Sequence, residues 1–96
     1  MIDSKGIKAI ISKFEADPGT RGVLICDTSG FPIGRSKELN QAMADDVAAY
    51  ITSVIGNTRK VTEALGEGEL NFVKIETQSG EIMIAPQSDF ILIVLK

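Results

Sequence analysis

Histidine and tryptophan are absent from this chain of 96 residues, and cysteine and tyrosine each occur once. Without histidine, the chain cannot build a Ser-His-Asp or Cys-His catalytic site or a histidine-ligated metal site. The scarcity of aromatic residues argues against the stacking platforms that bind single-stranded nucleic acid. The single cysteine, Cys26, excludes an internal disulfide and is typical of a reducing compartment. We therefore expect no catalytic residue, no cofactor and no metal.

Basic charge and long apolar runs are lacking as well. The formal net charge is −3, whereas proteins that bind nucleic acid or anionic membranes usually present a basic surface. The longest apolar run, FILIVL at residues 90–95, is far shorter than the roughly 20 residues that cross a bilayer. The N-terminus begins with polar residues where a secretory signal would be apolar. These features predict a cytoplasmic protein that neither binds nucleic acid nor inserts into a membrane.

What is present suits one small folded domain over residues 1–96. Hydrophobic residues make up 44% of the chain and charged residues 24%, which is ordinary for a globular protein. A chain of this length buries roughly 65% of the surface that it exposes when unfolded. Its stability is therefore modest, and an oligomer interface would add to it.

The first part of the chain predicts a helix followed by two strands. Apolar residues spaced three and four positions apart indicate an amphipathic helix over residues 3–16. The continuous apolar run Val23–Cys26 predicts a strand over residues 21–27 that is covered on both faces. A second strand over residues 31–35 contains Pro32, which cannot donate a ladder hydrogen bond. We therefore expect this strand at an edge of the sheet.

The longest predicted element is a helix over residues 41–65, which Asn40 can cap at its start and Gly66 at its end. At about 37 Å it is longer than a typical strand of about 20 Å. It therefore offers more apolar surface than its own sheet covers. One apolar stripe comprises Ala44, Ala48, Ile51 and Ile55, and the other comprises Met43, Val47, Tyr50, Val54 and Val61. The helix is either a core helix of a monomer or an element that a second chain also covers.

Three further strands are predicted over residues 70–77, 81–85 and 90–95, separated by turns of hairpin length. Such turns join antiparallel strands. The last strand is apolar at every position and is expected at the centre of the sheet, buried on both faces. The residues thus predict an α/β (α+β) fold in the order helix, two strands, long helix, three strands. We expect an antiparallel sheet with one helix on each face.

Three segments together resemble the Roadblock family. They are GVLICDTSGFPI at residues 22–33, LNFVKIETQSGEIMIAP at residues 70–86 and DFILIVL at residues 89–95. The family includes dynein-associated light chains, prokaryotic regulators of Ras-like GTPases and lysosomal scaffold subunits. The likeness covers nearly the whole chain and follows the order of the predicted elements.

The resemblance implies a profilin-like Roadblock fold with a five-stranded antiparallel sheet in the order 2-1-5-4-3. It also implies a homodimer in which the third strands and the long helices of two copies meet across a two-fold axis. The paired helices would form a platform, with Ile51, Ile55 and Arg59 as candidate partner contacts. Carried onto this sequence, the dimer interface comprises Met43, Val47, Tyr50, Val54, Asn57, Val61, Leu70, Phe72 and Lys74.

The residues themselves also favour pairing. An unpaired strand edge is an aggregation hazard unless it is covered, and a symmetric partner covers both the edge and an apolar stripe. Asn57 either fixes the register of a helix pair or faces water. Gly56 is either kept for close helix approach or tolerated at a cost of about 1 kcal/mol. Arg59 either acts in trans on a GTPase or is ordinary surface charge, and Cys26 is interpreted as an inert core thiol.

Our leading interpretation is a non-enzymatic homodimeric scaffold whose paired long helices bind and regulate a Ras-like small GTPase. The alternative is an accessory light chain of a dynein motor that binds a segment of an intermediate chain. A third class, an enzyme or small-molecule sensor on the same scaffold, would need an apolar pocket with converging polar groups. The sequence presents no such set of residues.

Overall fold

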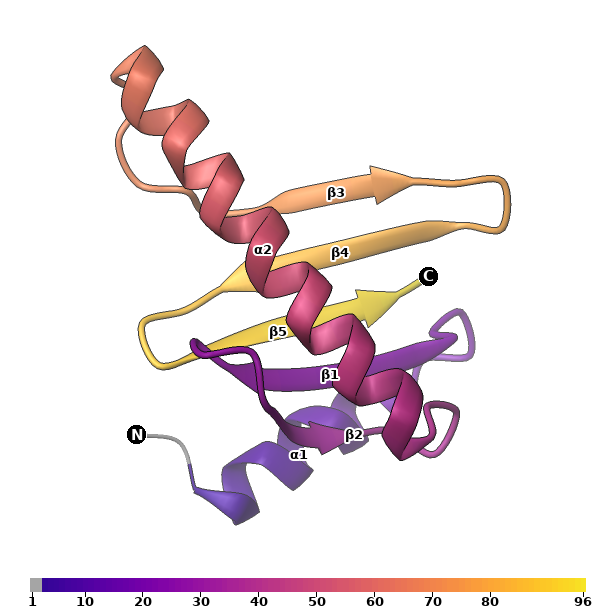
Figure 1. Ribbon diagram of the computed structural model, residues 1–96. Coiled ribbons are helices and arrows are strands. Elements are labelled where there is room, and N and C mark those ends of the chain that lie inside the picture. The colour runs from indigo at the N-terminus through magenta and orange to yellow at the C-terminus, as the bar shows by residue number, and fades with distance from the viewer. Residues whose placement is uncertain (1–2) are drawn as a thin grey trace.

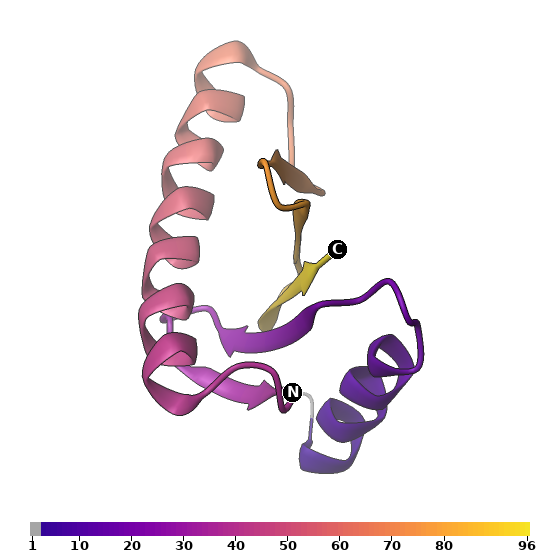
Figure 2. The same cartoon turned by 90° about the vertical axis from the view of Figure 1, so that its right-hand side faces the viewer.

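The computed structural model describes residues 3–96, which form two helices and five strands in the predicted order. They are α1 (Ser4–Glu15), β1 (Gly22–Asp27), β2 (Pro32–Arg35), α2 (Gln41–Leu65), β3 (Val73–Glu76), β4 (Glu81–Pro86) and β5 (Phe90–Leu95). The strands make one antiparallel sheet in the order β2-β1-β5-β4-β3. The helices α1 and α2 lie on opposite faces of this sheet (Figures 1 and 2). The predicted topology is therefore confirmed.

The two most apolar strands occupy the middle of the sheet. β5 pairs with β1 on one side and with β4 on the other, so its predicted central position is confirmed. In β1, all four residues from Val23 to Cys26 have an exposed fraction of 0%. A strand that is apolar on both faces lies where both faces are covered. β2, which contains Pro32, lies at the edge, as predicted.

Alternate side chains of the sheet serve two separate cores. On one face, the buried residues of α2 pack against β1, β4 and β5 through Leu24, Ile84 and Ile93. On the other face, α1 packs its buried residues against Val23 and Ile25 of β1. The period of two along each strand divides the apolar residues between the faces. The helical period then presents one apolar stripe of each helix to the sheet.

The boundaries of α2 follow the predicted capping residues. The Asn40 side-chain oxygen accepts a hydrogen bond from the Met43 backbone nitrogen at 2.8 Å, as expected of an N-cap. Gly66 adopts a left-handed conformation with φ of 67°, which glycine tolerates better than residues with a side chain. Both predicted caps are confirmed. Neither helix within residues 3–96 has the length and apolar character that a bilayer span requires.

The prediction for the third strand is wrong in length. A strand was predicted over residues 70–77, whereas β3 comprises Val73–Glu76 alone. Val73 pairs with Ile84 of β4, so extending the ladder backwards by two residues would bring the chain opposite Pro86. Proline has no N–H to donate to a ladder. Residues 70–72 therefore approach the sheet without joining this ladder.

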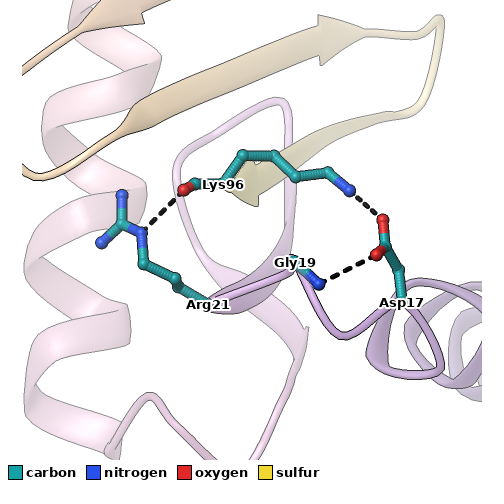
Figure 3. Close-up of polar contacts among 4 residues, drawn as sticks. All are labelled: Asp17, Gly19, Arg21 and Lys96. Atoms are coloured by element: carbon teal, nitrogen blue, oxygen red, sulfur yellow. Dashed lines mark hydrogen bonds and ion pairs between the residues drawn. The ribbon is translucent and has the colours of Figure 1, made fainter.

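The end of β5 is attached to the connection between α1 and β1 (Figure 3). Arg21 Nε donates a hydrogen bond to the Lys96 carbonyl oxygen at 2.9 Å, and Lys96 Nζ forms an ion pair with Asp17. The Gly19 backbone nitrogen donates to Asp17 Oδ1 at 2.9 Å. The hydrogen bond from Lys96, followed by that from Gly19, holds the pKa of Asp17 below its ordinary value. These contacts hold the α1 segment against the centre of the sheet.

Candidate functional site

The helix α2 extends beyond the sheet that it covers. In Figure 1 its C-terminal part projects past the β3 edge, and Figure 2 shows the sheet lying along one side of the helix. Its buried residues are Ala44, Ala48, Ile51 and Ile55, and none lies C-terminal to Ile55. The last turns of α2 are therefore not packed against the core within the described chain.

One of the two predicted apolar stripes on α2 lies outside the core. Met43, Tyr50 and Val61 are exposed, Tyr50 to 71%. Val54 is half-buried, Val47 is half-buried and packs against the core beneath α2, and Asn57 interrupts the stripe and is exposed. A row of large apolar side chains along a helix is normally covered. Most of this stripe therefore lies on an accessible face of α2, whereas Leu70, a further residue of the expected interface, packs against the core. The role of these residues in self-pairing stays a prediction.

β3 forms the edge of the sheet that the C-terminal part of α2 crosses (Figure 1). It pairs with β4 on one side and is the last strand in the order. Val73 and Ile75 pack towards the α2 core, whereas Lys74 and Glu76 are exposed. Phe72, immediately before β3, is 51% exposed. Residues 72–76 therefore combine a free strand edge with an exposed aromatic ring.

Lys74 has its partners within the chain. Its Nζ lies 2.7 Å from Glu81 Oε2 and 3.7 Å from Glu76 Oε1. The hydrogen bond to Glu81 is the main cause that raises the pKa of Lys74, and attraction to Glu76 adds to it. Lys74 is therefore cationic at neutral pH and needs no carboxylate from another chain to balance its charge.

The structure corrects two of the predicted partner contacts. Ile51 and Ile55 have exposed fractions of 6% and 1% and belong to the core beneath α2. They lie on the stripe shared with Ala44 and Ala48, which the helical period turns towards the sheet. A partner on the outer face of α2 would therefore not contact their side chains. Arg59, the third predicted contact, is exposed.

Arg59 lines an open cleft of about 1030 Å³ that the sequence did not reveal. The cleft lies between the C-terminal end of α2, the connection to β3 and the turn between β4 and β5. Its charged lining residues are Arg59, Glu63 and Glu69, of opposite signs. Within residues 3–96, no three His, Cys, Asp or Glu side chains are grouped as a metal site requires.

Cys26 fits the interpretation of an inert thiol. It is fully buried in β1, and burial raises the pKa of the thiol to about 11. A thiol with such a pKa is protonated at neutral pH, and the thiolate is the reactive form.

Sequence reasoning did not single out Leu65, Phe31 or Ile33, which are also exposed. Their apolar character was visible, but their exposure depends on the packing of α2 and β2.

Comparisons with known proteins agree with the observed fold. The chain matches the profile of the Roadblock/LC7 domain over residues 6–96. A crystal structure of a Roadblock/LC7 domain from Streptomyces avermitilis is similar, with a TM-score of 0.81 and 21% identity over 91% of this chain and 74% of that chain. Myxococcus xanthus MglB is similar with a TM-score of 0.87 and 16% identity over 98% of this chain and 77% of that chain.

A structure of MglB with a tetrameric arrangement is similar as well, with a TM-score of 0.83. Its identity is 15% over 99% of this chain and 74% of that chain. At these identities, the three solved structures establish a shared fold. The profile match, which spans nearly all of the chain, establishes the family.

Proposed function

The chain belongs to the Roadblock/LC7 domain family, and on that premise we propose that it is a non-enzymatic homodimeric scaffold that regulates a Ras-like small GTPase. Two copies pair through β3 and the exposed stripe of α2, and the paired helices receive the GTPase. The observation that carries the proposal is the exposed apolar stripe of α2 beside a free strand edge. A second copy covers both surfaces through one symmetric contact.

Several features support a binding role rather than catalysis. The thiol of Cys26 is buried and protonated. The charged residues that line the cleft are an arginine and glutamates, which carry opposite signs. Family membership and the likeness to MglB in a tetrameric arrangement support self-assembly. The scaffold acts by binding the two nucleotide states of the GTPase with different affinities, because equal affinities would shift no equilibrium.

The first test is the mass of the protein in solution at several concentrations, by size-exclusion chromatography with light scattering. We expect twice the chain mass of 10.3 kDa, and we expect it to persist on dilution. A mass of one chain at every concentration would contradict the homodimer. In that case a different protein would cover the free edge of β3 and the apolar stripe of α2.

The second test is binding to a Ras-like GTPase loaded with GDP or with a non-hydrolysable GTP analogue. We expect dissociation constants that differ at least about tenfold between the two forms, equivalent to about 1.4 kcal/mol. Arg59→Ala is expected to weaken binding, whereas Lys8→Ala on α1, at the opposite face of the sheet, is a matched control. Equal affinities, together with tight binding of a dynein intermediate-chain segment, would favour the motor light chain instead.

A further inference from the structure

We propose that two copies pair through β3 in one register, in which Val73 of each copy lies opposite Val73 of its partner. The inference rests on the proposed homodimer and adds the register of its strands and the contact that selects it. The register follows from the hydrogen-bond pattern, the charges and the exposed ring along residues 72–77.

The ladder between β3 and β4 determines which backbone groups remain free. Thr77 and Gly80 donate to each other's carbonyl oxygens, with N–O distances of 2.8 and 3.4 Å. In an antiparallel ladder, alternate residues point their N–H and C=O groups towards the neighbouring strand and away from it. Counting back from Thr77, Ile75 and Val73 point these groups towards β4.

The backbone groups of Lys74 and Glu76 therefore point towards the free edge. An independent hydrogen bond agrees, because the Lys96 nitrogen donates to the Glu81 carbonyl oxygen at 2.8 Å. Glu81 lies opposite Glu76, and its carbonyl group is directed to the far side of β4. Glu76 and Glu81 therefore exchange no backbone hydrogen bonds with each other. The backbone N–H and C=O groups of Glu76 remain available to a strand on the free edge of β3.

Two-fold symmetry and charge restrict the register further. A two-fold axis perpendicular to a continuous sheet keeps each side chain on its own face of the sheet. Neighbouring residues along a strand point to opposite faces, so a residue of β3 cannot lie opposite its neighbour's copy. One residue of β3 must therefore lie opposite its own copy. A register centred on Lys74 would oppose two lysines, and one centred on Glu76 would oppose two glutamates. Like charges directly opposite each other are destabilising. Val73 and Ile75 remain as possible centres.

The surroundings of Lys74 and Phe72 favour Val73. A register centred on Ile75 would oppose Lys74 to Glu76 of the partner subunit, but Lys74 is already 2.7 Å from Glu81, and exposed ion pairs contribute little. It would also leave Phe72, which is 51% exposed, opposite turn residues. A register centred on Val73 places Phe72 opposite the partner's Lys74, whose aliphatic stem can pack on an aromatic ring while its ammonium group stays paired with Glu81.

The position of α2 favours the same centre. In Figure 1, α2 crosses the edge of the sheet near the start of β3 and not near its end. An axis at Val73 therefore lies close to α2 and brings the two copies of the helix together. Moving the axis by two residues shifts it about 7 Å along the strand and shifts the second helix by about twice that distance. The exposed stripes would then lie farther apart than they do with an axis at Val73.

Single cysteine variants under mild oxidation test the register directly. In a pair without backbone hydrogen bonds, the two Cα atoms are about 4.5 Å apart, within the range that a disulfide bridges. We expect Val73→Cys to form a disulfide-linked dimer at least about tenfold faster than Lys74→Cys and Ile75→Cys. The wild-type protein is the background control, because Cys26 is buried.

The possible outcomes distinguish an error in the register from an error in the homodimer itself. Preferential cross-linking through Lys74→Cys or Ile75→Cys would overturn the register but retain the homodimer. A wild-type protein with the mass of one chain would overturn both. Substitutions without cysteine provide a second measurement. Phe72→Ala should raise the dimer dissociation constant at least tenfold and Glu76→Lys less than twofold, whereas the opposite order would support a centre at Ile75.

Discussion

At the scale of single residues, two glycines are expected to respond oppositely to replacement by alanine. A Cβ atom at Gly34 in β2 would clash with Ile7 Cγ2 and would lie 2.9 Å from Ile11 Cδ1. These side chains, or α1 with them, would have to shift, and such overpacking costs about 1–3 kcal/mol. At Gly56 in α2, a Cβ atom meets nothing within 4 Å, so alanine should stabilise the helix by up to about 1 kcal/mol. Urea unfolding of Gly34→Ala and Gly56→Ala at one protein concentration measures both effects.

Each glycine variant has a result that would contradict the packing described above. If Gly34→Ala unfolds at the parent urea concentration, α1 does not lie as close to β2 as the structure places it. If Gly56→Ala loses stability or weakens self-association, the glycine serves close approach of two helices after all. Both variants replace glycine by alanine, so the chemistry of the new side chain is the same in each. Opposite changes in the free energy of unfolding must therefore come from the two positions.

The burial of a residue could be predicted from the sequence where the apolar character of its segment alone determines it. Val23–Cys26 form a continuous apolar run, and such a run is stable only when both faces of the strand are covered. On α2, both stripes are apolar, and the sequence did not show that Ile51 and Ile55 face the sheet while Tyr50 faces outwards. The rotation of the helix about its own axis as it packs on the sheet decides that question, and this rotation is a tertiary property.

At the scale of elements, the N-cap of α2 provides a test of the helix that carries the candidate surface. Replacing Asn40 by alanine removes the acceptor for the Met43 nitrogen and should cost about 1 kcal/mol. Ser53→Ala is the control, because Ser53 is exposed in the helix interior outside the expected interface, where alanine is the better helix former. Urea unfolding should show a loss for Asn40→Ala and none for Ser53→Ala. Equal losses would mean that α2 does not begin at this cap.

Helices and strands were predictable as elements, but the length of β3 was not. The period of the apolar residues indicated α1 and α2, and the capping residues gave the ends of α2. Apolar residues continue ahead of β3 at Leu70 and Phe72, yet its ladder stops before Pro86. The length of a strand therefore depends on a residue in its neighbour, which local periodicity does not report.

At the scale of the whole molecule, the residues and the resemblance contributed different parts of the fold. The residues alone predicted an antiparallel sheet, a central last strand and a helix on each face. The order 2-1-5-4-3 came from the resemblance to the Roadblock family, because hairpin lengths do not determine where β1 joins β5. The same limit applies to the candidate surface: Ile51 and Ile55 were assigned to a partner by family likeness and by apolar character, and they lie in the core.

The proposed dimer predicts that one charge on the exposed stripe separates the two copies. Val54 is half-buried on α2, and Val54→Asp would bury an unpaired carboxylate in the helix contact. Leaving a buried charge without a partner costs about 3–5 kcal/mol, and a symmetric interface contains the change twice. Even about 3 kcal/mol in total would raise the dissociation constant about a hundredfold. Sedimentation velocity should therefore show a shift to monomer.

Ser53→Asp is the matched control for this variant. Ser53 is exposed on the adjacent position of α2, which points away from Val54 on the helix surface, and it receives the same charge. This variant should remain dimeric at the concentrations that dissociate Val54→Asp. Circular dichroism of both variants establishes that α2 is intact, since Val54 lies outside the buried residues of the helix. A folded Val54→Asp protein that stays dimeric would remove Val54, and with it this stripe of α2, from the self-pairing surface.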